Sequence, residues 1–562
     1  MRGSRIWLVL LAGLLATAAK PAQAAAAPID RCEERWFDQH LDHFRWWPAA
    51  GAGAGAQPPR TWRQRYFVCG RADWRGPGAP VFFYAGNEGP VEGYIASGGL
   101  MWENAPAFGA LLVWAEHRYY GQSQPFGPDS WRVDPTFLTS RQAMSDYARL
   151  LTNLTAEWGA GESPIIAFGG SYGGMLAAWM RRHYPHIITG AVAASAPVAQ
   201  FPGVPGFEPS RFWQVVTKSA TPEAGAPADC ADNVRAAFGR LLALGGGEEG
   251  RRRLGELFRL CEPLQGEGDA ATLAYWVQGA FDAFGMGAYP FPSSYMGGTP
   301  EHPLPAWPMR AACAHLTRAP SAGAAAAGAV AGRPGGGLPA APRRLRPGGG
   351  AGAAASVAAG GGRGGGGGGA LGEDDDWLLS GLREAAAVLY NATQDKPCFD
   401  LALEGPAAGN AGPWDWQVCT EFLGQELPYF PATGGADMFW DQGPFDPAAI
   451  SAHCREAWGV EPVLDDHVVA DGGADYRGVT NIVFSNGLLD PWSAFGVLER
   501  PPGADDSVAV VIIPDGGHHV DLMFSHPEDS DSIRSARGEI LDHVRRWVGG
   551  AAPSAPSAAA AV

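Results

Sequence analysis

Short apolar runs that end in glycine alternate with helix-period segments in the first third of the chain. Apolar side chains recur at helical spacing in Thr139–Trp158, and a second helix is predicted over Tyr172–Pro185. Buried strands are predicted in Ala79–Gly86, Gly109–Gly121, Ser163–Gly170 and Ile188–Val198. Strands that alternate with helices in this order favour a parallel α/β sheet.

The strand pattern returns near the end of the chain. Val479–Gly487 and Asp506–Gly517 predict two more strands, and Ser532–Val548 predicts a closing amphipathic helix. Between the two strand-containing parts, the pattern is helical and rich in loops. The simplest interpretation is one α/β domain that is interrupted by a large insertion lying over it as a cap.

These patterns divide the chain into segments. We expect a first α/β segment at 30–202, a helical cap at 203–473 and a second α/β segment at 474–549. Within the cap, residues 320–371 are built mainly from Ala, Gly, Pro and Arg, so they predict a disordered loop that has little apolar surface to bury. The Ala/Pro/Ser tail at 550–562 is expected to be disordered for the same reason.

The N-terminus has the pattern of a secretory signal peptide over residues 1–24. A basic start, MRGSR, precedes the apolar run IWLVLLAGLLATAA and the small residues AQA. The alternative is a membrane anchor, but the run is shorter than the ~20 residues that a spanning helix needs. No later segment predicts a span. We therefore expect a protein of the secretory pathway that lies in a lysosome or vacuole or is extracellular, without a membrane partner.

Composition narrows the choice of function. The chain has 562 residues, 46% of them hydrophobic, and a formal net charge of −17, so nucleic acid is not expected as a partner. The eight cysteines suit disulfides in an oxidising compartment, and none lies in a CxxC or Cys/His cluster, so a zinc site is not expected. We also expect no other metal and no cofactor. Asn153 and Asn391 begin N-x-T sequons that are candidate glycan acceptors.

The sequence GGSYG centred on Ser171 stands after a predicted strand and before a predicted helix. This G-x-S-x-G pattern is typical of a nucleophile elbow, where small neighbours permit the sharp turn that exposes a serine. The backbone amide of Tyr172 would then donate to a developing oxyanion. The alternative is a glycine-rich turn that is packed for steric reasons only.

A nucleophilic serine needs a base and a carboxylate that orients the base. In α/β-hydrolases both follow the serine in the chain, the acid before the histidine. Asp490 and His518 each come just after a late strand, and they are the preferred acid and base. Weaker candidates are Asp475, Asp515 and Asp521 for the acid, and His519, His526 and His543 for the base.

A second oxyanion donor is expected from a loop after an early strand. The segment AGNEG follows the strand that contains Phe82 and Phe83, and its glycines let the backbone approach a substrate closely. Asn87 and Glu88 are therefore candidates for this region, and an ordinary strand-to-helix turn is the alternative.

Six motifs together resemble the lysosomal serine exopeptidases typified by Pro-X carboxypeptidase and dipeptidyl peptidase II. The resemblance extends from about Arg35 to Trp547, apart from the low-complexity segment. The motifs are WFDQHLDHF (Trp36–Phe44), FFYAGNEG (Phe82–Gly89), EHRYYGQSQPFG (Glu116–Gly127), AFGGSYGGMLAAW (Ala167–Trp179), SNGLLDPWS (Ser485–Ser493) and GGHHVDL (Gly516–Leu522).

The resemblance implies an α/β-hydrolase fold with a helical, disulfide-bonded cap, and a triad of Ser171, Asp490 and His518. It also implies cleavage next to proline in an acidic compartment such as a lysosome or vacuole. Met175 and Trp492 match positions that line the proline pocket, although either could be plain core packing. The disulfides it implies are Cys230–Cys313, Cys261–Cys398 and Cys419–Cys454, with Cys32 and Cys69 left open.

One position departs from the family pattern. The family commonly has arginine after HHxDL, whereas this chain has Met523, so a charged support for the active-site loop is either missing or supplied elsewhere. This departure affects the expected substrate preference and pH optimum.

The substrate terminus is the main open question. A dipeptidyl peptidase needs a carboxylate for the N-terminal ammonium, and Glu88 and Glu421 could serve. A carboxypeptidase needs a cation or exposed N–H groups for the C-terminal carboxylate, and Arg118 could serve or could be structural. The segments ALLVWAEHRYYG and SHPEDS favour the first, and PLPAWPMRAAC favours the second. We expect a dipeptidyl peptidase II-like enzyme acting on peptides with a penultimate proline, with a homodimer as one assembly. Alternatives are a Pro-X carboxypeptidase, an esterase on the same fold and an inactive binding glycoprotein.

Overall fold

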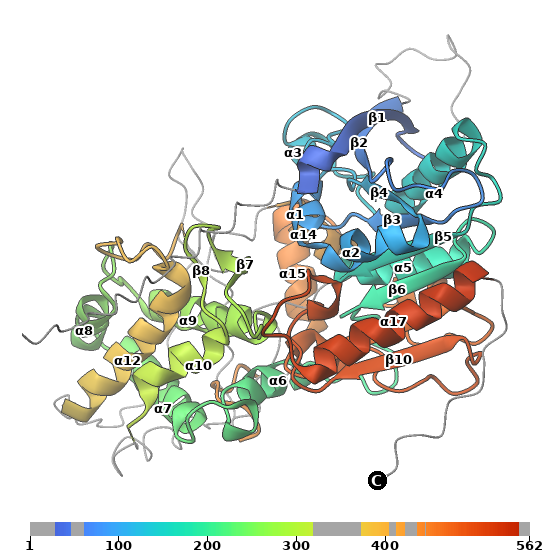
Figure 1. Cartoon of the computed structure of the whole chain (residues 1–562). Helices are drawn as coiled ribbons and strands as arrows, with labels where there is room; N and C mark the ends of the chain where they lie inside the picture. The colour runs from blue at the N-terminus through green and yellow to red at the C-terminus, as the bar shows by residue number, and fades with distance from the viewer. Residues whose placement is uncertain are drawn as a thin grey trace, which may run out of the picture.

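The computed structural model describes residues 28–45, 61–318, 373–403, 412–421, 435–443 and 445–549. The expected signal peptide, the low-complexity loop and the C-terminal tail lie outside the described residues. The two parts that the sequence predicts are visible in Figure 1, where a sheet flanked by helices stands beside a helical cap. Among the described helices, none combines the length and hydropathy needed to cross a bilayer.

Eight strands form a mixed sheet in the order β1-β2-β4-β3-β5-β6-β9-β10. The pairings from β4 through β10 are parallel, whereas β1 with β2 and β2 with β4 are antiparallel. The strands are β1 (Cys32–His40), β2 (Thr61–Cys69), β3 (Val81–Ala85), β4 (Leu111–Ala115), β5 (Ile165–Gly170), β6 (Gly190–Ala194), β9 (Ile482–Gly487) and β10 (Val508–Ile513).

Alternation along the strands builds a core on each face of the sheet. Phe83 and Ala167 point to the face that is covered by α4 (Ser140–Glu157) and α5 (Tyr172–His183). Their neighbours Phe82 and Phe168 point to the opposite face, towards α1 (Val91–Ser97), α2 (Gly99–Phe108) and α17 (Asp531–Gly549). Because successive side chains alternate and helices cover both faces, the strands read as continuous apolar runs.

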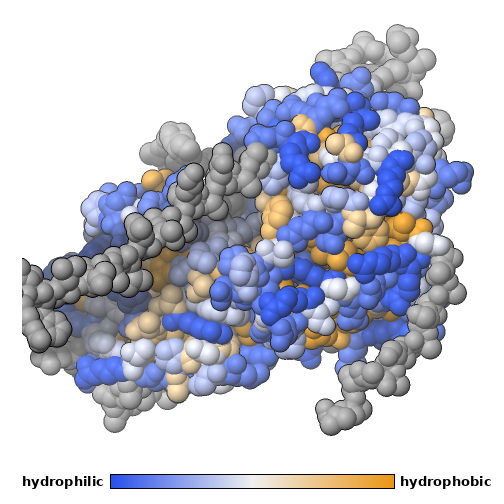
Figure 2. Space-filling view, in the orientation of Figure 1, coloured by the Kyte–Doolittle hydropathy of each residue, from blue (hydrophilic) through white to orange (hydrophobic). Residues whose placement is uncertain are grey.

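The closing helix is amphipathic, as the sequence predicts. Ile533, Ile540 and Val544 of α17 are buried against the sheet. The outer surface of α17 is mainly hydrophilic in the space-filling view (Figure 2). Helical spacing of apolar residues therefore produces a helix with one face in the core and one in solvent.

The cap has its own core, in which α7, α9 and α12 pack together around Trp276 and Phe281. Its elements are α6 (Arg211–Ser219), α7 (Cys230–Gly245), α8 (Glu248–Phe258), α9 (Glu267–Met286), β7 (Ser293–Gly298), β8 (Pro303–Leu304), α10 (Pro308–Cys313) and α12 (Glu373–Tyr390). Three further helices follow them in the chain: α14 (Pro413–Glu421), α15 (Pro447–Trp458) and α16 (Asp466–Ala470). In this later part, Trp416 of α14 packs with Trp62 and Tyr120 of the sheet-containing part rather than with the cap core.

Four disulfides join the eight cysteines. The three pairs that the family resemblance implies, Cys230–Cys313, Cys261–Cys398 and Cys419–Cys454, are confirmed. The pair that the sequence leaves open is Cys32–Cys69, which links opposed residues of β1 and β2. An inserted cap with disulfides on an α/β-hydrolase sheet is therefore the fold of this chain.

Candidate active site

Ser171 stands on the turn between β5 and α5. Its backbone has φ 58° and ψ −129°, a region that side chains with a Cβ rarely adopt. The amide of Ser171 donates to Ala194 O at 2.9 Å, and its carbonyl accepts from Met175 N at 3.0 Å. These bonds hold a strained turn that exposes the serine side chain, which is the geometry of a nucleophile elbow.

The glycines beside Ser171 are required by close contacts. A Cβ on Gly169 would lie 2.0 Å from Gly173 O, where the helix folds back on the strand. A Cβ on Gly170 would lie 2.7 Å from the ring of His519. The glycine cluster therefore serves the turn and its neighbours, and it is followed directly by a regular helix.

Asp490 and His518 are brought together from separate strand ends. His518 Nδ1 lies 2.9 Å from Asp490 Oδ2 in a buried pair. The other oxygen of Asp490 accepts from Trp492 N at 3.1 Å, so the carboxylate is fixed on both sides. Because a carboxylate only accepts, Nδ1 carries the proton and Nε2 is left to act as a base.

Ser171 and His518 line one cavity of about 370 Å³. The cavity lies where the loop after β3, the start of α5, the late loops and the cap meet. Seven of the eight residues that the sequence proposes for the site line this cavity. The eighth, Asp490, does not line it and instead contacts His518. Those lining residues are Asn87, Glu88, Ser171, Tyr172, Met175, Trp492 and His518.

The first residue of α5 is Tyr172, whose backbone N–H belongs to the unpaired first turn of the helix. Its buried side chain is anchored at the hydroxyl, which lies 3.0 Å from His117 Nε2 and accepts from Gln417 Nε2 at 3.1 Å. Burial lowers the pKa of His117 to about 4, so that ring is neutral. The anchored side chain keeps the Tyr172 amide in place beside the nucleophile.

The loop after β3 presents two polar side chains with unsatisfied oxygens. Asn87 Oδ1 and Glu88 Oε2 are shielded from solvent and lack a hydrogen-bond partner within the described chain. Burial raises the pKa of Glu88 above its ordinary value of 4.5. Unpaired buried oxygens are costly, so they point to groups that a bound substrate satisfies.

Met175 and Trp492 form apolar walls of the cavity. Met175 is almost fully buried, and the Trp492 ring packs edge-on against Phe212 with ring centroids 4.9 Å apart. Sequence reasoning missed further apolar walls that the cap and its following segment supply: Met286, Tyr295, Met296 and Trp414. These residues lie in no motif, and only the folded cap brings them to the elbow.

The other acidic candidates have partners elsewhere. Asp475 pairs with Arg477 at the surface, and the carboxylate of Asp515 accepts from Ser532. Asp521 is buried and accepts from Ser485 Oγ at 2.7 Å. In this arrangement, Asp490 is the carboxylate that contacts His518.

The other histidines are placed differently from His518. His519 lines the cavity, but its amide donates to Ser195 Oγ at 2.8 Å, and burial with nearby His518 lowers the pKa of His519 well below its usual range. His526 packs its ring on Phe291, and His543 lies on α17 near Trp547. His519 therefore serves as a buried wall of the site.

The other charged candidates for binding a substrate terminus, Arg118 and Glu421, make buried structural contacts. Arg118 is fully buried and bonds both oxygens of Asp146, with Nε 2.7 Å from Oδ2. Glu421 accepts from the amide and the hydroxyl of Ser140 at 2.9 Å and 2.8 Å. Neither side chain lines the cavity that holds Ser171.

A cation from α17 supports the loop that carries His518. Arg537 is 6% exposed, and its guanidinium donates to the carbonyls of Val520, Asp521 and Phe524 at 2.9, 3.2 and 3.2 Å. It also pairs with the carboxylate of Asp529. Arg537 therefore supplies the charged support that Met523 cannot provide.

One group of side chains has metal-ligand character. Asp415, Cys419 and His453 bring ligand-type atoms within 4.8 Å of one another. The sulfur of Cys419 is bonded to Cys454, and Asp415 already contacts His453 and the indole of Trp458. These bonds explain the group as a structural link between α14 and α15.

Comparison with known proteins agrees with the motifs. The profile of the serine carboxypeptidase S28 family matches residues 39–330 and 384–540. Lysosomal Pro-X carboxypeptidase of Mus musculus is 32% identical over 91% of this chain and 88% of its own length. The Homo sapiens protein of that name is 31% identical over 91% and 88%, and the Mus musculus thymus-specific serine protease is 28% identical over 92% and 87%.

Solved structures overlap a smaller part of the chain. A carboxyl esterase from Bacillus coagulans covers 33% of this chain and 49% of its own, with 14% identity and a TM-score of 0.22. Oligopeptidase B from Leishmania major covers 30% and 21%, with 15% identity and a TM-score of 0.21. The family assignment rests on the sequence matches, which span both α/β segments and most of the cap: the chain belongs to the serine carboxypeptidase S28 family of serine peptidases.

Proposed function

We propose that this chain is a proline-directed serine exopeptidase that acts through an acyl-enzyme. The observation that carries the proposal is the shared cavity, in which Ser171 and His518 face apolar walls formed by Met175 and Trp492. A proline ring is compact and apolar, so aromatic and thioether walls suit it. The family membership supports peptide-bond hydrolysis as the reaction.

The chemistry follows from the geometry. His518 Nε2 takes the proton of Ser171 Oγ as the oxygen attacks the carbonyl carbon of the proline residue. Asp490 holds the imidazole and stabilises its charged form. The oxyanion accepts from the Tyr172 amide, with the loop of Asn87 and Glu88 beside it. His518 then protonates the departing amine, and a water molecule, deprotonated by the same nitrogen, hydrolyses the ester and frees Ser171.

Release of the C-terminal residue is the first candidate specificity. Pro-X carboxypeptidases are about 30% identical to this chain over most of both lengths. This similarity favours carboxypeptidase activity over the dipeptidyl peptidase activity that we expect from the sequence motifs. Within the described lining of the cavity, Lys and Arg are absent. A substrate carboxylate would therefore meet backbone N–H groups and, at acid pH, the protonated carboxyl of Glu88.

Release of an N-terminal dipeptide is the second candidate. The unpaired Glu88 Oε2 favours it, because an ionised carboxylate in the cavity would bind a substrate ammonium. Both candidates place proline in the same pocket, and they differ in the terminus that is held. The proposal also includes entry into the secretory pathway and action in an acidic compartment, as the N-terminal pattern and the names of the lysosomal relatives suggest.

The test uses two substrates with one variant. N-blocked peptides that end in Pro-Xaa report release of the last residue, and free-amine Xaa-Pro-aminoacyl-naphthylamides report release of a dipeptide. Each is measured across acid pH with the wild type and with Ser171→Ala. Loss of cleavage in the variant is expected, and a fluorophosphonate should label Ser171 in the wild type. A wild type that neither labels nor cleaves would refute the proposal and favour a binding glycoprotein, whereas cleavage of acyl esters alone would favour an esterase.

A further inference from the structure

The cap holds the backbone of the catalytic histidine. Helix α9 of the cap ends at Met286, and His518 N donates to Met286 O at 2.8 Å. Three residues after Met286, the hydroxyl of Tyr289 donates to His518 O at 3.1 Å. The amide and the carbonyl of the same residue are thus both bonded to the cap.

Tyr289 is built to be a permanent donor at this point. Its side chain is 1% exposed, and its ring lies nearly parallel to that of Phe291, with centroids 5.9 Å apart. Burial, with the nearby charge of Asp490, raises the pKa of Tyr289 well above its usual range. The hydroxyl therefore stays protonated in the acid and neutral range, and the buried ring holds it against the carbonyl of His518.

The glycine before His518 brings the loop into backbone contact with the cap. A Cβ on Gly517 would lie 2.8 Å from Met286 O and 2.8 Å from Ala288 O. Contacts this short with backbone atoms require one of the two chains to move. The two hydrogen bonds between the cap and His518 therefore depend on Gly517 having no side chain.

The same helix end also reaches the loop of the catalytic acid. The Trp492 indole Nε1 lies 3.3 Å from Met286 Sδ, and Gly285 of α9 faces the ring of Pro491. The acid and base loops thus share one support, which is the end of α9.

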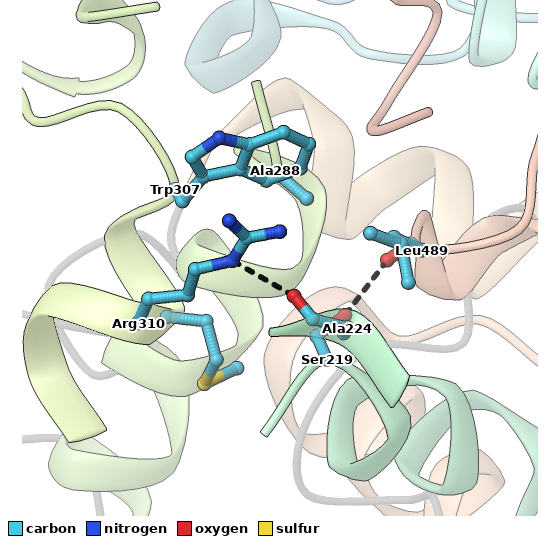
Figure 3. Close-up of a pocket in the computed structure, with 7 residues that line it drawn as sticks. Ser219, Ala224, Ala288, Trp307, Arg310 and Leu489 are labelled. Carbon is cyan, nitrogen blue, oxygen red and sulfur yellow. Dashed lines mark hydrogen bonds between the residues drawn. The ribbon is translucent and has the colours of Figure 1, made fainter. Parts of the chain in front are cut away.

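A second link lies at a small neighbouring cavity, shown in Figure 3. There Ser219 Oγ of the cap donates to Leu489 O at 3.3 Å, one residue before Asp490. On the other side, Arg310 lies against the ring of Trp307 and donates to Ala224 O at 2.8 Å. The segment that carries Ser219 and Ala224 is therefore tied both to the acid loop and to α10.

We propose that the cap is a structural part of the catalytic machinery and that Tyr289 is a positioning residue, which orients His518 towards Ser171. The proposal rests on the catalytic roles proposed above. Without the Tyr289 hydroxyl, the His518 backbone would lose one of its two bonds to the cap, and Nε2 would move relative to the serine. Displacements of ~1 Å in a catalytic group can cost roughly 100-fold in rate.

Tyr289→Phe removes only the hydroxyl, and Tyr390→Phe is its matched control. Tyr390 also lies in the cap, and its hydroxyl donates to a carbonyl, Trp276 O, at 2.9 Å. The measurement is the second-order rate constant for fluorophosphonate labelling of Ser171, together with the final labelled fraction. We expect Tyr289→Phe to label about tenfold more slowly but to completion, and Tyr390→Phe to stay within about twofold of the wild type.

Gly517→Ala provides a second test, with Gly538→Ala on α17 as its control. A Cβ on Gly538 has no neighbour within 4 Å, so that variant should label at the wild-type rate. Gly517→Ala should slow labelling at least as much as Tyr289→Phe, with the folded fraction checked by near-UV circular dichroism. If both test variants label as fast as their controls, the cap's role is refuted while the proposed triad stands. If the wild type itself does not label, the proposed function fails.

Discussion

Substitution of Glu88 by glutamine tests which terminus of the substrate the enzyme binds. Glu88 lines the cavity beside Ser171, and its Oε2 lacks a partner within the described chain. A protonated Glu88 can donate to the C-terminal carboxylate of a Pro-Xaa peptide, whereas an ionised Glu88 repels it. Glutamine keeps the donor and never ionises. Glu88→Gln should therefore retain carboxypeptidase activity at acid pH.

The magnitude follows from the strength of one charge-assisted hydrogen bond. Such a bond contributes about 1.5–3 kcal/mol, which corresponds to roughly 10- to 150-fold in kcat/KM at about 1.4 kcal/mol per tenfold. Burial raises the pKa of Glu88, so the protonated form persists above 4.5 and is lost as the pH rises through the raised pKa. The wild type should lose activity on Pro-Xaa peptides over that range, and Glu88→Gln should not.

The assay is kcat/KM from acid to neutral pH, with Glu92→Gln as the control. Glu92 lies four residues further on and pairs with Arg65 outside the cavity, so its variant should keep the wild-type pH profile. A loss of tenfold or more for Glu88→Gln on Pro-Xaa peptides at acid pH would refute the donor role. If that loss falls instead on free-amine Xaa-Pro substrates, Glu88 holds an ammonium and the enzyme is a dipeptidyl peptidase.

Three further predictions concern stability and the inserted segment. Arg537→Met should lower the free energy of unfolding by roughly 3–5 kcal/mol, since it leaves buried Asp529 without its cation; urea unfolding measures this, and an unchanged midpoint would contradict it. Replacing residues 320–371 by a short Gly/Ser linker should leave the Tm and the rate of Ser171 labelling unchanged. Arg318 and Asp374, on either side of the segment, pair at 2.8 Å, so a short linker can span the gap; a variant that is folded but unable to label would show a role for the segment. Although burial raises the pKa of Asp471, hydrogen bonds with His183 and His467 bring it down to about 2. A depressed carboxyl pKa stabilises the fold above about 3.8 and loses that effect as the pH falls through about 2, so Asp471→Asn should have a lower Tm at pH 5 and a flatter Tm profile below about pH 4.

The parallel part of the sheet could be predicted because its strands are buried on both faces. Residues 81–85 and 165–170 are uninterrupted runs of apolar residues and glycine, and such runs can be recognised in the sequence as buried strands. The first two strands could not be predicted in this way. The sequence CEERWFDQH of β1 carries four charged residues, and only its pairing with β2 and the Cys32–Cys69 disulfide make it an edge strand.

The candidate site likewise contains residues that the sequence predicts and residues that it does not predict. Ser171, Asp490 and His518 stand in short local motifs whose turn chemistry is visible in the sequence, and the structure brings the last two within 2.9 Å. Met286 and Tyr295 stand in no motif, since their contact with the cavity depends on the docking of the cap. Sequence reasoning left Arg118 open between substrate binding and a structural role, and its buried bonds to Asp146 favour the structural role.

Glycine marks the places where these distant contacts occur. Gly170 admits the His519 ring beside the elbow, and Gly517 admits the cap carbonyls beside His518. In both cases the sequence shows that a side chain is excluded without showing what excludes it, because the neighbouring atoms come from residues more than two hundred positions away. At these two positions, glycine before a catalytic residue is therefore required by a tertiary contact as well as by a turn. Here that contact makes the base dependent on the cap, so substitutions at the end of α9 should alter the rate of acylation even though none of those residues takes part in proton transfer.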